Sequence, residues 1–388
     1  MYKIFLFFSV VFSMPVNSQS IRVATFNVSM EATNYMEPSQ AATADVLSKH
    51  LLSSRSQQIS HIAEVIQRVQ PDIILLNEFD YSEQSNKAVM AFRRNYLNSA
   101  KNGAPSIDYP YFYSAPVNTG IDSGLDLDRD GIASGTKGDA FGFGLFPGHY
   151  GMVVLSKYPI QFDNIRSFQH FLWKDMPNNL MASIKDENGR SYYTQQAQQI
   201  LRLSSKSHWD IPIKIGNHTI HILASHPTPP VFDGPENRNG KRNHDEIRFW
   251  TDYLSTSEKS AYIYDDTGKR GGFNGKHFVI AGDLNASPDE GDGIKNGIKG
   301  LLAHPLVNAL VVPKSAGGQR HTPDNQYAAT HTADWAMRAD YVLPSKTLNV
   351  TTSGIFWPKS DEPLFGLIKD RKSSSDHRLV WVDIEMAD

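Results

Sequence analysis

The chain has 388 residues, and its 38 lysines and arginines against 41 aspartates and glutamates give a formal net charge of −3. Hydrophobic residues make up 40% and charged residues 20% of the chain, which is typical of a globular protein and excludes a disordered or collagen-like one. The weak negative charge provides no polycationic surface for non-specific binding to nucleic acid or anionic membranes. The absence of cysteine excludes disulfides, thiolate metal sites and a cysteine nucleophile. Any catalysis must therefore use oxygen and nitrogen side chains.

The first residues have the pattern of a cleavable signal peptide. Lys3 precedes an apolar run over residues 4–14, and the small residues that follow suit cleavage before Gln19. The run is shorter than the roughly 20 residues needed to cross a bilayer, and no later stretch predicts a transmembrane anchor. A buried N-terminal strand or helix is the alternative. We therefore expect a signal peptide over residues 1–18 and a secreted or periplasmic protein.

Apolar runs and amphipathic segments alternate along the rest of the chain. The β-branched run over 21–28 predicts a central strand, and isoleucines at helical spacing predict a helix over 56–69 that ends before Pro71. A second amphipathic helix is expected near 246–254. Further strands are expected over 72–76, 151–155, 218–224, 277–281, 341–343 and 379–384.

This alternation indicates an α/β protein, and no change in composition or linker divides it. We therefore expect a single catalytic domain over residues 19–388. Residues 100–150 and 160–210 are predicted to be long insertions rich in loops, which in a compact domain are more often functional than idle.

Polar side chains follow five of the predicted strands. Each one alone is an ordinary turn residue. Together they supply carboxylates, amides and two imidazoles at strand ends, where α/β proteins open onto a crevice. Such an oxygen-rich set suits Mg²⁺, Mn²⁺ or Ca²⁺ and not structural zinc. The residues are Asn27, Glu78, His226, Asp283, Asn285, Asp376 and His377.

Six short motifs in chain order give the sequence a specific resemblance. They are Phe26-Asn27-Val28, Leu76-Asn77-Glu78, Ser225-His226, Gly282-Asp283-Leu284-Asn285, Arg338-Ala339-Asp340-Tyr341 and Ser375-Asp376-His377. Together they resemble the motifs of the endonuclease/exonuclease/phosphatase superfamily, which includes deoxyribonuclease I-like nucleases, abasic-site endonucleases, sphingomyelinases and inositol-polyphosphate phosphatases. The resemblance spans residues 21–384. It implies a four-layer α/β sandwich, in which two mixed β-sheets pack face to face with helices outside and the active site at one end.

The resemblance also implies a metal site and a group that activates water. Glu78 would bind Mg²⁺, Mn²⁺ or Ca²⁺, with Asn27 and Asp376 joining or supporting the coordination. Asp283 would orient or deprotonate the attacking water, and Asn285 would hold that water or a phosphate oxygen. For Asn27, closing a turn is the alternative role.

Three further residues would act on the phosphate. By the same resemblance, His377 would donate to a non-bridging phosphate oxygen, and Asp340 would fix its tautomer and favour the imidazolium. His226 would bind phosphate or protonate the leaving oxygen. A surface carboxylate at the end of a strand is the alternative for Asp340.

Two segments carry features outside these motifs. Between the strand that ends at His226 and the next helix, Arg242 and Asn243 are candidates for binding a second phosphate or an anionic head group, or else belong to a solvated loop. A second segment begins like a calcium-binding loop, but its twelfth position is Lys137, where an EF-hand has glutamate. A structural Ca²⁺ and an ordinary Asp/Gly turn both remain open there. The carboxylates concerned are Asp126, Asp128 and Asp130.

The function that we expect is that of a secreted, metal-dependent phosphoesterase, which hydrolyses phosphate mono- or diesters by direct attack of water. The low net charge favours small or lipid-like phosphates over nucleic acid. An extracellular nuclease acting on DNA or RNA is the first alternative, and a module that binds a phosphorylated ligand without turnover is the second. The sequence lacks the motifs of serine esterases, P-loop proteins and zincins, and it indicates no protein partner.

Overall fold

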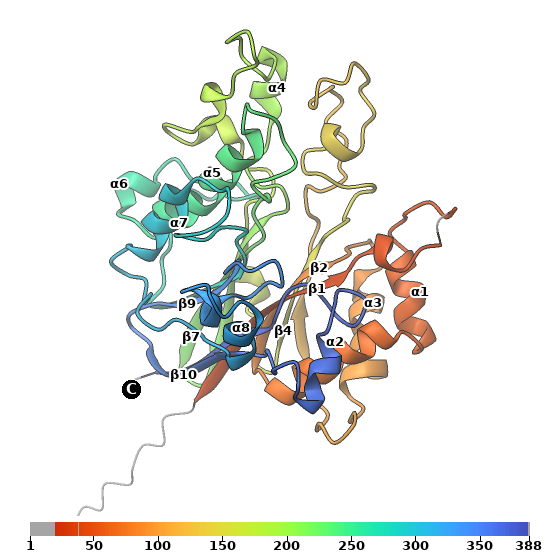
Figure 1. Ribbon diagram of the computed structural model, residues 1–388. Helices are drawn as coiled ribbons and strands as arrows, with labels where there is room; N and C mark the ends of the chain where they lie inside the picture. Colours follow the sequence, from red (N-terminus) through yellow and green to blue (C-terminus); the bar gives the residue numbers. More distant parts are fainter. Residues whose placement is uncertain (1–19, 38, 387–388) are drawn as a thin grey trace, which may run out of the picture.

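The computed structural model describes residues 20–37 and 39–386, with two β-sheets in the middle and helices outside (Figure 1). The expected signal peptide lies outside the described residues. Within them, no helix combines the length and the apolar character that crossing a membrane requires.

The first sheet contains six strands, and only β1 and β2 run parallel in it. Its order is β10 (Asn349–Ile355), β11 (Val380–Glu385), β1 (Ile21–Met30), β2 (Ile73–Phe79), β4 (Met152–Ser156) and β3 (Tyr111–Tyr113). The strand β1 is central and almost wholly buried, as its apolar run predicts.

The second sheet contains five strands, and only β7 and β8 run parallel in it. Its order is β5 (Arg166–Ser167), β6 (His208–Ile215), β7 (His218–Ser225), β8 (His277–Asp283) and β9 (Asp340–Pro344). The two sheets pack face to face, because β1 contacts both β8 and β9. The predicted sandwich of two mixed sheets is therefore confirmed.

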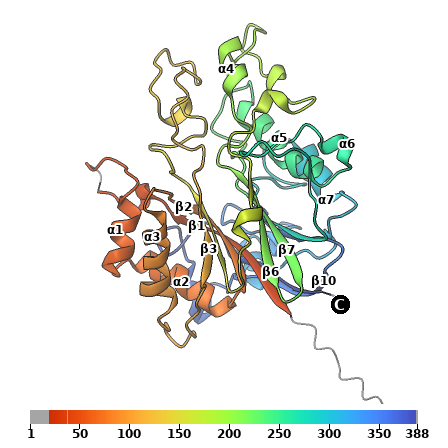
Figure 2. The ribbon, with the colours of Figure 1, turned by 180° about the vertical axis from the view of Figure 1, so that it is seen from behind.

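Helices cover the outer face of each sheet (Figures 1 and 2). On the first sheet lie α1 (Val46–Ser53), α2 (Gln57–Val69) and α3 (Ser85–Phe92). The helices near the second sheet are α5 (Arg238–Tyr253), α6 (Ser257–Ser260), α7 (Lys295–Leu302) and α8 (Ala316–His321), whereas α4 (Gln195–Ile200) lies at the far end of the insertion over 160–210 (Figure 1).

The helix predicted over 56–69 is α2, and its ends follow from local chemistry. The Ser56 hydroxyl accepts the Ile59 N–H at 3.3 Å, which satisfies one free donor of the first turn. Gln70 ends the helix in a left-handed conformation, with φ of 55°, and Pro71 follows it. Ile62 and Ile66 lie on the buried face that packs on the sheet.

The second predicted helix begins earlier than the sequence suggests. The apolar spacing near 246–254 marks only its second half, whereas α5 starts at Arg238. Asn243, Asp245 and Glu246 are fully buried in it. A buried polar face has no hydrophobic periodicity, and for that reason the pattern did not reveal this half.

The predicted insertions extend beyond one end of the sandwich, above the labels of β1 and β2 in Figure 1. They touch each other there, because the Tyr192 hydroxyl donates to the Asp128 carbonyl at 3.0 Å. An ion pair of 3.4 Å between Arg129 and Asp186 joins them as well.

Candidate active site

Strand direction brings the predicted polar residues to one end of the sandwich. Because β1 runs parallel to β2 and β7 runs parallel to β8, their carboxyl ends share an edge within each sheet. The side chains of Asn27, Glu78, His226 and Asp283 therefore leave the strands at this end. Since β9 runs antiparallel to β8, its first residue, Asp340, also lies there.

Asp283 is at the centre of the cluster. Its Oδ2 atom accepts a hydrogen bond from Asn27 Nδ2 at 3.1 Å and lies 3.4 Å from His226 Nε2 and 3.5 Å from His377 Nε2. Its other oxygen accepts the Asn285 N–H at 3.0 Å. Burial would raise the pKa of Asp283, but the positive charge of His377 and the hydrogen bond from His226 hold it below the usual range. The carboxylate is therefore ionised and held in one orientation.

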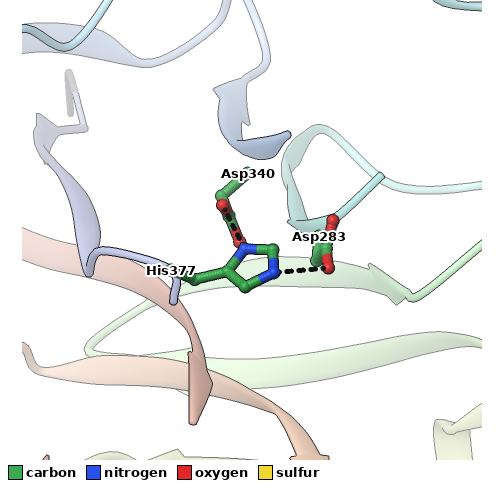
Figure 3. A group of neighbouring side chains, drawn as sticks. All are labelled: Asp283, Asp340 and His377. Carbon is green, nitrogen blue, oxygen red and sulfur yellow. Dashed lines mark hydrogen bonds and ion pairs between the residues drawn. The ribbon is translucent and has the colours of Figure 1, made fainter. Parts of the chain in front are cut away.

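His377 lies between two carboxylates (Figure 3). Its Nδ1 atom is 2.8 Å from Asp340 Oδ2, and its Nε2 atom faces Asp283. Although burial would lower the pKa of His377, Asp340 and Asp283 raise it to about 10. The Thr332 hydroxyl donates to the same Asp340 oxygen at 2.7 Å and so fixes the position of that carboxylate. His377 is consequently an imidazolium, and the Asp340 bond sets its ring orientation.

His226 and Asn285 complete the group around Asp283. Burial lowers the pKa of His226, and the nearby Lys206 charge lowers it further. The buried Nδ1 atom of His226 has no hydrogen-bond partner in the described part of the chain. Asn285 donates to the Pro227 carbonyl at 3.1 Å from a left-handed backbone with φ of 51°. These residues are therefore positioned tightly while the imidazole keeps an unused nitrogen.

Glu78 has two features of a metal ligand. Its backbone is left-handed, with φ of 58°, which is uncommon for a residue that carries a Cβ and marks positions under functional constraint. Its Oε2 atom is buried and accepts no hydrogen bond from the described residues. A buried carboxylate oxygen without a donor is costly unless a cation neutralises it. The Glu78 carboxylate thus fits the divalent metal that the sequence predicts.

The nearest cation to Glu78 in the structure is Arg371. The guanidinium lies 3.7 Å from Glu78 Oε2, 3.5 Å from Glu31 Oε1 and 3.1 Å from Asp376 Oδ2. The carboxylates of Glu78 and Asp376 therefore lie on one guanidinium. Against the effect of burial, Glu78, Asp376 and Glu31 raise the pKa of Arg371.

Several residues at this end of the sandwich were not predicted from the sequence. Arg371 is one of four charged residues in a row before the last motif. Glu31 and His149 form a fully buried ion pair of 3.0 Å behind Arg371. Trp335 is 45% exposed and places its ring edge-on to His377, at 4.7 Å between centroids. An aromatic residue five positions before Asp340 could have been noticed, but no motif marks it.

Lys206 is the least expected of the missed residues. It is only 6% exposed, and its ammonium makes no hydrogen bond or ion pair with the described residues. Burial lowers its pKa, while Glu246, Glu78 and Asp283 oppose the shift. The sequence shows it only as one lysine in a serine-rich segment before β6, a strand that the pattern also missed.

Arg242 and Asn243 have a different environment from the one expected. Both lie inside α5, not in a loop before the helix. The Arg242 guanidinium donates to the backbone carbonyls of Leu203, Phe141, Arg202 and Ser204, at 2.6–3.2 Å. Asn243 Nδ2 donates to two more carbonyls, at 2.8 and 3.0 Å. Most of these donors thus tie loops together, and binding of an anion by the two residues stays a prediction.

The three aspartates of the calcium-like loop lie close enough to share one ion. Asp126 accepts the backbone N–H groups of Arg129 at 2.7 Å and of Gly131 at 3.0 Å, as an Asp turn does. The structure therefore contains the turn, and calcium binding there stays a prediction.

The protein is thus an α/β sandwich that carries a group of carboxylates and imidazoles around Asp283 at one end of its strands. The sequence profile of the Endonuclease/Exonuclease/phosphatase family matches residues 24–377. The chain belongs to this family, whose members are metal-dependent hydrolases that act on phosphoester bonds. No curated protein matches the chain in sequence.

Solved structures resemble the chain at low sequence identity. An endonuclease/exonuclease/phosphatase from Beutenbergia cavernae is 15% identical, with a TM-score of 0.51 over 95% of this chain and 72% of that chain. A family protein from Leptotrichia buccalis is 14% identical, with a TM-score of 0.46 over 94% of this chain and 100% of that chain. A beta toxin variant from Staphylococcus aureus, solved with bound magnesium ions, is 14% identical, with a TM-score of 0.42 over 95% of this chain and 100% of that chain.

Proposed function

We propose that the protein is a secreted phosphoesterase that uses Mg²⁺ or Mn²⁺ to hydrolyse phosphate mono- or diesters by direct attack of water. The observation that carries this proposal is the arrangement of Asp283, His377 and Glu78. An ionised carboxylate, a charged imidazolium and a carboxylate oxygen without a donor meet at one end of the sandwich. These are the parts that hydrolysis of a P–O bond needs.

Asp283 is the group that takes the proton of the attacking water. Asn27, His226 and His377 surround its Oδ2 atom and stabilise the carboxylate, so it is ionised and oriented before the substrate arrives. The backbone N–H of Asn285 holds the other Asp283 oxygen, and its side-chain amide, which also donates to the Pro227 carbonyl, would hold the water or a phosphate oxygen.

The charge that develops on phosphate is met by donors of the chain. His377 presents Nε2–H while Asp340 holds Nδ1–H, so the imidazolium can donate to a non-bridging oxygen without losing its orientation. His226, through the Nε2–H that faces Asp283, and Lys206 are further donors near Asp283. Glu78 would hold the divalent ion, supported by Asn27 and Asp376. When bound, that ion polarises a phosphoryl oxygen and offsets its charge.

The substrates that we favour are small or lipid-like phosphates, because the net charge of −3 offers no long-range attraction for a polyanion. Cutting of DNA or RNA is the alternative. Export of the domain is what the N-terminal sequence pattern suggests.

A substrate panel tests the proposal. The chain over residues 19–388 is incubated with Mg²⁺, Mn²⁺ or Ca²⁺, with and without EDTA, on p-nitrophenyl phosphate, its bis-ester, plasmid DNA and RNA. We expect turnover of the small esters that EDTA and Glu78→Gln abolish, and that Asp163→Asn, a change of an exposed acid, leaves intact. Cutting confined to nucleic acid would make the protein a nuclease. No turnover of any substrate in the panel would favour a protein that binds phosphorylated ligands without hydrolysing them.

A further inference from the structure

A basic pocket lies beside the candidate metal site. It has a volume of about 680 Å³ and is formed by the loop after β1, the facing ends of α1 and α2 with the segment that joins them, and the segment before β11. Arg55, Arg371, Lys372 and His50 line it, and none of its described lining residues is Asp or Glu. A pocket with this lining favours an anion.

Arg371 joins the pocket to the active site. Its side chain lines the pocket, while its guanidinium lies within 3.7 Å of Glu78 and 3.1 Å of Asp376. A cation at Glu78 would compete with Arg371 for these carboxylates. The Arg371 guanidinium would then have donors free for an anion in the pocket. The pocket and the candidate metal site are therefore neighbours, and both use the Arg371 side chain.

The floor of the pocket is rigid and fixed to the same strand ends. Gln58 Nε2 donates to the carbonyls of Val28 at 3.1 Å and Ser374 at 2.5 Å, and the Tyr35 hydroxyl donates to Gln58 Oε1 at 2.5 Å. The Tyr35 ring stacks on His50, at 5.1 Å between centroids. An anion bound here would therefore have a fixed position relative to the residues that follow β1 and to the His377 segment.

The positive charge of the pocket is largely unpaired. Neither Arg55 nor Lys372 makes an ion pair with the described residues, and both are exposed. Guanidinium and ammonium groups that converge on one pocket are the donors that phosphate prefers.

We propose that this pocket binds a second phosphate group of the substrate, while the first is hydrolysed at Asp283. The inference rests on the proposed function, because it assigns the pocket to a molecule held in the active site. A bisphosphorylated small molecule and the neighbouring phosphate of a nucleotide chain offer the same chemistry. The substrates in the test distinguish these two sources.

The first experiment compares substrates that differ by one phosphate. Alkanediol bisphosphates with spacers of increasing length are assayed against the matching alkyl monophosphates, and short oligothymidylates against a thymidine monoester. We expect the double variant Arg55→Gln/Lys372→Gln to raise KM for the best bisphosphate by about tenfold or more and to leave KM for its monophosphate unchanged. The control pair Arg190→Gln/Lys359→Gln removes two exposed charges elsewhere and should change neither. An equal effect on both substrates, or no effect, would overturn the proposal.

The second experiment needs no turnover. Inorganic phosphate is titrated calorimetrically into the full chain, in EDTA and in saturating Mg²⁺, and into the same double and control variants. Binding that weakens by about tenfold only in the Arg55→Gln/Lys372→Gln protein supports the pocket. Binding unchanged in that variant, or absent from the wild type, overturns it. Because this readout is independent of hydrolysis, a chain that binds phosphate here but hydrolyses nothing would refute the proposed function and not the pocket.

Discussion

Asp283 and Asp340 lie directly opposite each other in the antiparallel register of β8 and β9. The two carboxylates are kept apart by the ring of His377, which contacts one with each nitrogen (Figure 3). A single strand pairing thus places the proposed base and the residue that orients the imidazolium at a fixed spacing.

This relationship predicts a large effect of Asp340→Asn. The variant removes the charge that holds Nδ1–H, and an amide can present either a donor or an acceptor to that atom. By analogy with the loss of an orienting aspartate beside a catalytic histidine, we expect kcat to fall by about a hundredfold or more. Thr332→Val removes the hydroxyl that donates to the Asp340 carboxylate and accepts the N–H groups of Ala339 and Asp340. Because the Asp340 charge beside His377 stays, it should lower kcat far less. Steady-state kinetics of both variants checks the order, and equal losses would contradict it.

Glu78→Gln should weaken metal binding without unfolding the protein. The change keeps the shape of the side chain but removes the charge of a buried oxygen that has no donor in the described structure. We expect Mn²⁺ affinity to fall by about tenfold or more, measured by calorimetry with circular dichroism as the control for folding. Unchanged affinity would show that the metal binds elsewhere.

Lys206→Met should separate activity from stability. The lysine ammonium is buried and forms no ion pair within residues 20–37 and 39–386, so replacing it by an apolar chain of similar length removes a desolvation cost. We expect the melting temperature to be equal or higher, while kcat/KM falls by about tenfold or more because a donor beside Asp283 is lost. A variant that melts lower and keeps full activity would show that Lys206 has a structural role.

Because His208 is buried, we expect the free energy of unfolding to fall in acid. Burial lowers its pKa from 6.5 to about 4, against the effect of Glu246. Because the folded-state pKa is the lower one, the unfolded chain binds the proton first, and stability falls as the pH drops through 6.5 toward 4. Integrated from pH 8 to pH 5, this group should cost about 2 kcal/mol.

Urea unfolding at the two pH values measures this cost. His208→Gln should reduce the pH dependence of the unfolding free energy by about that amount, whereas His170→Gln, at a 56% exposed side chain, should not. Equal pH dependence in His208→Gln and the wild type would rule out this role.

The strands that carry the active-site residues could be predicted from the sequence more fully than the residues that surround the site. The runs that end near Asn27, Glu78, His226 and Asp283 are long and apolar, because these strands are buried on both faces. Their polar neighbours were therefore visible as breaks in the pattern. In contrast, β6 is interrupted by His208, Asp210 and Pro212, and its burial depends on polar partners that no local pattern reveals.

Arg371 shows the second limit of sequence reasoning. Lys369, Asp370, Arg371 and Lys372 form one charged run. This segment packs on the end of β1, and that packing brings the Arg371 guanidinium close to Glu31 and Glu78. The other three residues of the run are exposed to solvent. The same packing creates the basic pocket. The sequence does not reveal this pocket, because the segments that form it lie more than 300 positions apart in the chain.

The most direct test of the account is the rate of p-nitrophenyl ester hydrolysis by Asp283→Asn in saturating Mn²⁺, with Mn²⁺ affinity measured on the same sample. We predict a loss in kcat of about a thousandfold or more with metal affinity nearly unchanged, because the variant keeps the shape of the site and removes the group that accepts the water proton. A variant that retains kcat within about tenfold of the wild type would contradict the role of Asp283 and with it the proposed mechanism.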